Sequence, residues 1–386
     1  MARRAGGAPG RAVSAAALVA ERVRDAAARG TRLRVRAGGA WMDANRPVAA
    51  DAELPLDGCT GIVEYVPGDL TLTARAATTL GEIADAARAH RQWLALDPFG
   101  PDAGTIGATV ATGSYGPLAA AYGTPRDQLL GVEFANGAGD LVRAGGRVVK
   151  NVAGFDLVRL MAGAWGTLGV ITEVTVRLRA LPAGDETLAL VMDDGGPALD
   201  RLGPRLRALA TPPLAAELVD GALARRLGLP ERPTLLLRIG GNAESMRAQR
   251  DAIAALGAAA PVDGTVWSAM RAAGEAGDAV WRISRGPARF AESWRDAADR
   301  LAPLPGARVQ GSPLRGVVRC AVPRAAAPAL AHALARPAGG TLVAETLPAD
   351  AWAAMPCMVD DRLSRGVRAA FDPARILNPG ILGEAA

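Results

Sequence analysis

A glycine-rich stretch at residues 99–117, FGPDAGTIGATVATGSYGP, is the feature that most constrains how this chain can fold. Its five glycines are interleaved with threonine and serine, and Asp102 is its only charged residue. The stretch has too few large apolar side chains to form a core of its own. Glycine lets the backbone approach a ligand closely, and free N–H and hydroxyl groups donate to anionic or heteroaromatic partners. The stretch therefore predicts either a cradle for a nucleotide cofactor or a loop between two strands.

Length and charge narrow the class of protein. The chain has 386 residues, enough for two or three domains with a large buried core. No apolar run reaches the ~20 residues that a membrane-spanning helix needs, and Glu21 interrupts the apolar part of the N-terminal segment. We therefore expect a soluble protein without a signal peptide. The net charge of +5 is spread along the chain, which favours small anions or an acidic partner over nucleic acid.

Cysteine and histidine are scarce. Cys59, Cys320 and Cys357 lie far apart in the sequence and form no CxxC pair. The only two histidines, His90 and His332, show no metal-ligand spacing. These patterns predict neither a disulfide framework nor a metal site, and they favour a reducing, cytoplasmic compartment.

Lysine is rarer still. Of the 44 lysine and arginine residues, only Lys150 is a lysine. A compact ammonium and a planar guanidinium differ in geometry and in how readily their pKa values shift. Lys150 is therefore predicted to belong to a functional site, and the alternative is an ordinary solvated lysine.

Short-range patterns in the first half of the chain predict helices and antiparallel strands. Ser14 is placed as the N-cap of a helix that ends at Gly30, and Thr79 with Glu82 forms a capping box ahead of a second helix. A turn at residues 136–140 joins two alternating segments into a hairpin. Further strands are predicted at residues 33–36, 61–65, 70–76 and 170–178.

The sequence from residue 183 to about residue 347 is predicted to form a separate domain. Strands and helices alternate there, which predicts a small ferredoxin-like α+β layer. The X-Pro turns near the C-terminus, at residues 363–382, predict a docked tail. The strands are expected near residues 188–192, 235–239, 316–321 and 342–345, and the helices near residues 198–209, 243–256 and 325–335.

Four ordered segments carry a resemblance to a known family. They read PDAGTIGATVATGSYGP, AYGTPRDQLLGVEFANGAGD, VVKNVAGFDLVRLMAGAWGTLGVITEV and FDPARILNPG. Together they resemble the FAD-binding domain of the p-cresol methylhydroxylase and vanillyl-alcohol oxidase superfamily, and within it the smaller flavin subunits of bacterial glycolate oxidases. The resemblance implies an α+β fold with an FAD-binding domain at residues 1–182, a cap at 183–347 and a returning C-terminal segment at 348–386.

The resemblance also implies a cofactor site. The N-terminal loop reads RAGGAW where the family usually has three glycines and a small hydroxyl residue, and it holds neither His nor Cys. We therefore expect FAD to be bound without a covalent bond, and no catalytic or metal-binding residue is assigned. The resemblance places the pyrophosphate at Gly38, Gly39 and Ala40, and it places Val170 and Ile171 near the adenine. Tyr122 and Gly123 are expected beside the cofactor. The residues expected to line the rest of the cofactor are Thr105, Gly107, Thr109, Thr112, Gly113 and Ser114.

By the same resemblance, the chain is an FAD-binding subunit of a complex that oxidises glycolate or a similar small 2-hydroxy acid. Hydride passes from the substrate α-carbon to the flavin. The expected partners are a larger flavin subunit and an iron–sulfur subunit, and the expected location is cytoplasmic or peripheral to the inner membrane through the complex. Two alternatives remain open. One is a structural subunit with a vestigial flavin cleft, and the other is a self-contained FAD-dependent dehydrogenase of another 2-hydroxy acid, in which Arg282, Arg285, Arg315 or Arg319 clamps a carboxylate.

Overall fold

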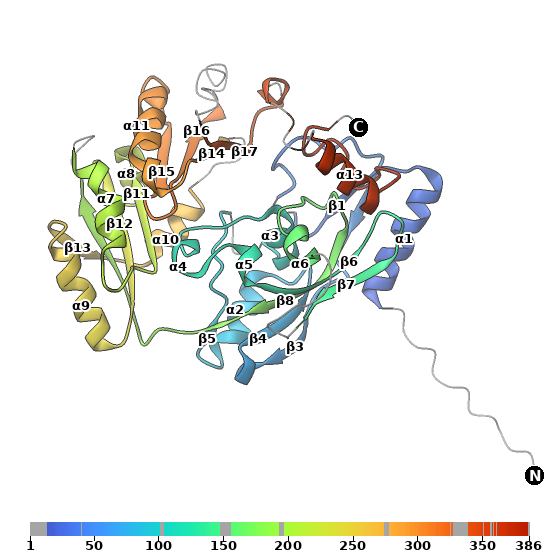
Figure 1. Ribbon diagram of the computed structural model, residues 1–386, viewed down its shortest axis with the longest axis horizontal. Coiled ribbons are helices and arrows are strands. Elements are labelled where there is room, and N and C mark those ends of the chain that lie inside the picture. The colour runs from blue at the N-terminus through green and yellow to red at the C-terminus, as the bar shows by residue number, and fades with distance from the viewer. Residues whose placement is uncertain are drawn as a thin grey trace, which may run out of the picture.

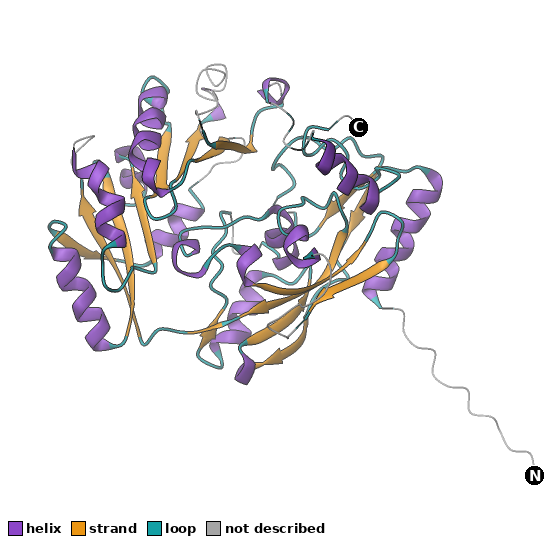
Figure 2. Ribbon diagram, in the orientation of Figure 1, coloured by secondary structure: helices purple, strands orange, loops and turns teal. Residues whose placement is uncertain are grey.

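The structure, a computed structural model, forms two lobes that lie side by side (Figure 1). The N-terminal lobe holds residues 14–181 and the last segment, 361–384, and the second lobe, here called the cap, holds residues 184–346. Both lobes mix helices and strands (Figure 2). None of the helices in the described parts of the chain is long and apolar enough to span a membrane. The residues described are 14–39, 41–100, 104–146, 156–192, 197–273, 278–324, 326, 339–349, 351–355, 357, 359 and 361–384.

The N-terminal lobe begins with the helix that the sequence predicts. In α1 (Ala15–Arg29), the Ser14 hydroxyl accepts a hydrogen bond from the N–H of Ala17, and Gly30 ends the helix with φ of +66°. The helix buries Val23 in the lobe's core. The chain then forms β1 (Leu33–Arg36), which pairs in parallel with β2 (Ala52–Pro55).

An antiparallel five-stranded sheet supports the rest of this lobe. The predicted capping box before α2 (Leu80–Arg88) and the hairpin between β6 and β7 are both confirmed. Shorter helices α4 (Ala119–Tyr122), α5 (Pro125–Gln128) and α6 (Leu157–Met161) lie around the sheet, and β5 (Gln92–Trp93) pairs with β9 (Arg179–Ala180). The strands lie in the order β3 (Ile62–Val66), β4 (Thr71–Arg75), β8 (Val170–Arg177), β6 (Leu129–Ala135) and β7 (Leu141–Gly145).

The C-terminal segment returns to the N-terminal lobe. After α13 (Arg362–Phe371), the carbonyl of Ile376 accepts a hydrogen bond from Leu33 N–H at 2.7 Å, and Asn378 N–H donates to the carbonyl of Leu33 at 2.9 Å. Asp372 is fully buried and accepts from the N–H groups of Ile376 and Leu377. The prediction of a docked tail is confirmed.

The cap sheet has more strands than the four that the sequence predicts. Its eight strands form one antiparallel sheet in the order β13, β10, β12, β11, β15, β16, β14, β17. Each half has the strand order of a ferredoxin-like unit, so two such units join edge to edge through β11 and β15. The first half holds β10 (Gly184–Val191), α7 (Pro197–Arg207), β11 (Ala215–Val219), α8 (Gly221–Arg226), β12 (Thr234–Gly241), α9 (Ala243–Ala254) and β13 (Ala259–Val262).

The second half follows α10 (Thr265–Arg271) and holds β14 (Ala279–Ser284), α11 (Phe290–Leu301), β15 (Arg308–Ser312), β16 (Val317–Val322) and β17 (Thr341–Thr346). The helix predicted near residues 325–335 lies almost wholly outside the described residues.

The two faces of the cap sheet differ in polarity. Alternation along β14 and β16 sends Trp281, Ile283 and Val318 into an apolar core with the outer helices, including α7 and α11. The intervening residues, such as Arg282 and Arg319, are turned to the opposite face, toward the N-terminal lobe. Figure 1 shows α7, α9 and α11 on the side of the cap that lies away from that lobe. The polar face is therefore held against the glycine-rich stretch.

Candidate functional site

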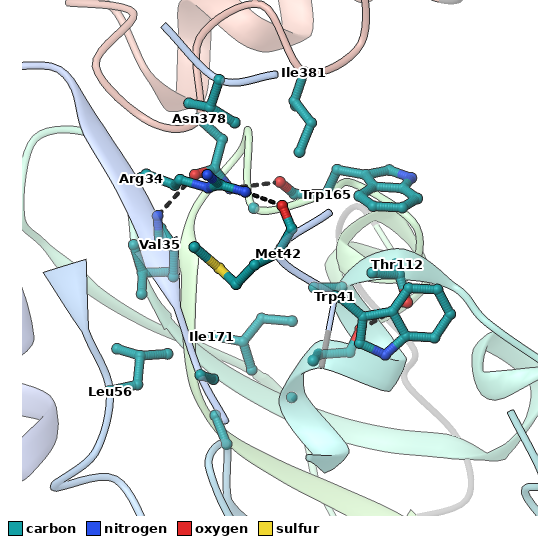
Figure 3. Close-up of a pocket in the computed structure, with 18 of the residues that line it drawn as sticks. Arg34, Val35, Trp41, Met42, Leu56, Thr112, Trp165, Ile171, Asn378 and Ile381 are labelled. Atoms are coloured by element: carbon teal, nitrogen blue, oxygen red, sulfur yellow. Dashed lines mark hydrogen bonds between the residues drawn. The ribbon is translucent and has the colours of Figure 1, made fainter. Parts of the chain in front are cut away.

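The first cavity lies inside the N-terminal lobe, between the loop after β1, helix α3 (Ile106–Thr112), the start of β8 and the C-terminal return (Figure 3). Its empty space is about 730 Å³, a figure that includes open solvent at its mouth. Its walls are Arg34, Val35, Ala37, Trp41, Met42, Ala44, Val48, Leu56, Ala76, Gly107, Ala108, Ala111, Thr112, Trp165, Gly166, Gly169, Val170, Ile171, Asn378 and Ile381.

Helix α3 forms a smooth wall of this cavity because the residues it presents are small. Gly107 N–H donates to the carbonyl of Ala76 at 2.8 Å, and a Cβ on Gly107 would lie only 2.6 Å from the Ala76 Cβ. The glycine is thus required by packing between the helix and the residue after β4. Gly107 also lines the cavity, so its place next to the cofactor, as the family resemblance implies, stays a prediction. Thr112 lines the cavity, and its hydroxyl donates to the carbonyl of Ala108.

The loop after β1 forms the opposite wall. The Arg34 guanidinium donates to the carbonyl of Met42 and so ties the loop back to its strand. Gly38 and Gly39 have φ of +58° and +82°, and a Cβ on Gly39 would meet nothing within 4 Å. In the sequence both glycines lie between the wall residues Ala37 and Trp41, and Gly39 N–H donates to the carbonyl of Ala37 while its own carbonyl accepts from Met42 N–H.

Asn378 joins three segments around the first cavity. Its Oδ1 accepts a hydrogen bond from Val35 N–H, and its Nδ2 donates to the carbonyl of Trp165, both at 2.8 Å (Figure 3). The side chain is nearly buried, and the backbone φ of +43° is one that asparagine tolerates better than most residues. Strand β1, the Trp165 turn and the C-terminal return are therefore fixed together by one amide.

The structure brings only part of the predicted cofactor residues together. Gly107, Thr112, Val170 and Ile171 line the first cavity. Ala40 and Lys150 lie outside the described residues, so their roles stay predictions.

Other predicted residues serve the local structure. Thr105 caps α3, and the hydroxyl of Thr109 donates to the carbonyl of Thr105 at 3.0 Å. Gly113 ends α3 with φ of +64°, and the N–H of Ser114 donates to the Thr112 hydroxyl. None of these four lines the first cavity.

Tyr122 and Gly123 lie farther from it. The Tyr122 ring stands edge-on to Trp93 with 5.6 Å between ring centroids, and a Cβ on Gly123 would collide with Asp127. Neither residue lines the first cavity.

Sequence reasoning missed several wall residues. Trp165 and Asn378 lie within segments that carry the family resemblance, so the sequence did offer a reason to assign them to the cofactor site. Arg34, Trp41 and Met42 gave no such signal, because their place in the wall depends on how the loop after β1 folds back.

The second cavity lies where the glycine-rich stretch meets the polar face of the cap sheet. Tyr115 stands between two guanidinium groups, 4.7 Å from that of Arg282 and 4.9 Å from that of Arg315, measured to the ring centroid. The Arg319 guanidinium lies 4.0 Å from the centroid of Phe99. The two lobes thus meet through arginine–aromatic stacking. The walls are Phe99, Tyr115, Gly116, Glu217, Arg282, Gln310, Gly311, Ser312, Arg315, Val317, Arg319 and Glu345.

This second cavity carries excess positive charge. Arg282 and Arg319 stand directly opposite each other on β14 and β16, an arrangement of like charges that is unfavourable without a counter-ion. Glu345 lies 2.9 Å from Arg319 and 3.8 Å from Arg282, and it neutralises one charge. Arg315 adds a third cation, and the buried Nε atoms of Arg282 and Arg315 have no hydrogen-bond partner. The arrangement is suited to an anion.

Three of the four arginines proposed from the sequence as a carboxylate clamp therefore converge on one cavity. The fourth, Arg285, instead forms an ion pair with Glu292 at 2.8 Å and does not line it.

Two carboxyl groups lie at this cavity, the half-buried Asp97 beside it and the buried Glu217 in its wall. Burial raises the pKa of Asp97 to about 7, although the N–H of Leu118 donates to its carboxylate. Burial also raises the pKa of Glu217 to about 8, and the nearby charge of Asp97 adds to this increase.

Comparison with known proteins identifies what the N-terminal lobe is. Residues 12–145 match the family described as FAD binding domain. Over 170 residues the chain is 38% identical to glycolate oxidase subunit GlcE of Escherichia coli (strain K12), a match covering 44% of this chain and 48% of that protein. Over 202 residues it is 29% identical to glycolate oxidase subunit GlcD of Bacillus subtilis (strain 168), covering 50% of this chain and 43% of that protein. The chain thus spans about half the length of the curated relatives it matches.

The fold has a solved counterpart across both lobes. 6-Hydroxy-D-nicotine oxidase from Arthrobacter nicotinovorans superposes with a TM-score of 0.64, covers 95% of this chain and 89% of its own, and is 19% identical in sequence. This likeness confirms the fold expected from the family resemblance. With the family match, it shows that the chain contains an FAD-binding domain.

Proposed function

We propose that this chain binds FAD noncovalently in the first cavity and acts as the flavin-binding subunit of a glycolate-oxidising complex. The proposed partners are a larger flavin subunit and an iron–sulfur subunit, in the cytoplasm or peripheral to the inner membrane. The complex would convert glycolate to glyoxylate and pass the electrons from the flavin to an acceptor. The names of the two matched glycolate oxidase subunits support this proposal.

The first cavity fits a flavin nucleotide. Its walls are mostly apolar, with a few polar groups such as Thr112 and Asn378, which is the usual character of a cofactor site. The small residues on α3 leave room for a flat ring system, and no neighbouring atom lies within 4 Å of a Cβ built on Gly39, so a phosphate group has space to approach this turn. Neither His nor Cys is among its wall residues, so the described walls offer no usual attachment point for a covalent flavin.

Each part of the chain would have a separate task in holding the cofactor. Gly38 and Gly39 would face the pyrophosphate, while Val170 and Ile171 would pack against an apolar part of the nucleotide. Asn378 keeps the walls in register and the apolar residues exclude water. When bound, FAD supplies the acceptor for a hydride.

A second candidate function rests on the second cavity. Convergence of Arg282, Arg315 and Arg319 beside the glycine-rich stretch favours a chain that binds the 2-hydroxy acid itself. In that case the chain would oxidise substrate without the larger flavin subunit. The third possibility, a vestigial cleft, requires that no flavin binds.

One experiment on the purified chain tests these alternatives. The protein should show a flavin absorption spectrum, and acid or heat should release the chromophore as FAD. Colour that stays with the precipitated chain would contradict noncovalent binding, and a colourless protein that takes up no added FAD would support the vestigial cleft. Glycolate oxidation with an artificial acceptor should then appear only in the copurified complex. Oxidation by the isolated FAD-loaded chain would favour the second candidate.

A further inference from the structure

Glu217 is the one carboxyl group of the second cavity that has no arginine at ion-pair distance. It lies on β11 in the middle of the cap sheet, is 5% exposed, and is a wall residue of the cavity together with the three arginines. Glu345, the other acidic wall residue, is within 4 Å of two of those arginines. The cavity thus contains one carboxylate, Glu345, that arginines neutralise, and one carboxyl group, Glu217, that no arginine pairs with.

The groups that face Glu217 come from every element packed against it. Asp97 approaches from the loop before the glycine-rich stretch, Arg315 from the turn after β15 and Arg319 from β16. Ser312 on β15, whose hydroxyl donates to the carbonyl of Ala216, lies beside the carboxyl group. Arg282 and Glu345 complete the charged wall from β14 and β17. Burial and Asp97 favour the protonated form, and the arginines oppose it without overcoming them.

We propose that the second cavity binds a small carboxylate together with one proton, which Glu217 holds. With Glu217 protonated, three arginines and Glu345 leave a net charge of +2 around the bound anion. The protonated carboxyl group also has an O–H to donate to a carboxylate oxygen. With Glu217 ionised, the net charge falls to +1 and the bound carboxylate faces a second carboxylate.

The size of the ligand follows from the cavity. Its empty space of about 370 Å³, which includes open solvent at its mouth, is about half that of the first cavity, and Phe99 and Tyr115 form part of its wall. An acid of two or three carbons suits this space. The inference rests on the proposed function only for the identification of this anion as a 2-hydroxy acid or its product, since the charge and the proton come from the walls themselves.

Because anion binding and protonation of Glu217 are linked, the affinity for the anion should depend on pH. A bound anion favours the protonated form of Glu217, so binding near the pKa of this group takes up a proton, and the affinity falls as the pH rises above about 8. Oxalate is a suitable probe because it is fully ionised over this range and cannot be oxidised by hydride transfer. Oxamide, which has the same shape without the charge, serves as the matched control ligand.

The test uses titration calorimetry of the FAD-loaded protein with oxalate between pH 7 and pH 9. In the parent protein the Kd should rise by about tenfold over this range, whereas Glu217→Gln should change less than twofold because its side chain stays neutral. Glu217→Asp keeps a titratable group and should restore the pH dependence. Arg319→Gln should weaken oxalate at least tenfold at pH 7, and Arg295→Gln, which removes an arginine paired with Asp200 on the outer side of the cap, should leave the Kd unchanged.

Three results would overturn the proposal: no oxalate binding at pH 7, equal binding of oxamide, or the same pH dependence in Glu217→Gln as in the parent. Far-ultraviolet circular dichroism and the melting temperature establish that each variant is folded. FAD content is read separately from the visible spectrum. A chain that binds FAD and supports glycolate oxidation in its complex but does not bind oxalate would contradict this inference alone, and a chain that binds no FAD would contradict the proposed function.

Discussion

At the scale of single residues, two glycines that the family resemblance treats alike have different surroundings. The resemblance assigns both Gly107 and Gly39 to the cofactor, yet the two positions differ. A Cβ on Gly107 would strike the backbone and side chain of Ala76, whereas a Cβ on Gly39 would point into open space. Gly107 is therefore required for the fold, and Gly39 is the better candidate for direct approach to a ligand.

We expect Gly107→Val to destabilise the protein by about 3 kcal/mol, because the added side chain overpacks the contact between α3 and Ala76. Chemical denaturation of the apoprotein measures this effect. Gly39→Ala is the comparison: it should cost only about 1 kcal/mol for its left-handed backbone and yet reduce FAD affinity. A Gly107→Val protein with parental stability and no FAD would support a direct role of Gly107 in binding.

Asp97 gives a prediction for the pH dependence of stability. Its folded-state pKa of about 7 lies above the ordinary value of 3.8, so the folded protein binds the proton more tightly than the unfolded chain. This contribution is fully present below pH 3.8 and is lost as the pH rises through about 7. Between pH 5 and pH 7, the parent should lose stability relative to Asp97→Asn by up to about 1.4 kcal/mol per pH unit. Urea denaturation at several pH values measures the difference, and parallel curves would show that Asp97 is solvated.

At the scale of elements, the sequence predicts best those features that depend on contacts between residues close together in the chain. The cap of α1 and the capping box of α2 depend on side chains within four residues, and both were predicted. Strands β11 and β15 were missed. Their sequences, AAELV and RVQGS, lack a run of large β-branched residues, and their pairing with each other joins distant parts of the chain.

The attachment of the C-terminal return to the N-terminal lobe can be tested by changing one side chain, that of Asn378. Asn378→Ala should leave Val35 N–H and the Trp165 carbonyl unpaired in a largely buried site and destabilise the protein by about 2–4 kcal/mol. FAD should restore part of this stability by mass action, at a higher FAD concentration than the parent needs. Thermal melts with and without FAD measure both effects. Asn242→Ala, which removes the N-cap of α9 in the cap, should lower the stability without changing the FAD dependence.

At the scale of the whole molecule, the sequence predicts the N-terminal lobe better than the site between the lobes. Four segments with strong turn and glycine patterns were enough to identify the FAD-binding domain, and Thr112, Val170 and Ile171 line the first cavity as predicted from the resemblance. The second cavity was not predictable as a unit. Arg282 and Arg319 come together only because β14 pairs with β16, and Tyr115 reaches them only once the lobes have docked. The four candidate arginines looked alike in the sequence, and strand register separates three of them from Arg285.

The amide of Asn378 also sets an order of events during synthesis. It binds Val35, 343 positions earlier in the chain, and neighbouring residues of the return complete the edge of β1. A ribosome must therefore translate the entire cap before the wall of the first cavity can close. The cap, whose strands pair only with one another, can fold during elongation while β1 is paired with β2 alone and still lacks its contact with the C-terminal return. Stable binding of the flavin is then a step that follows translation. When ribosomes carrying nascent chains that stall before residue 376 are sedimented, the pellet should contain no bound flavin.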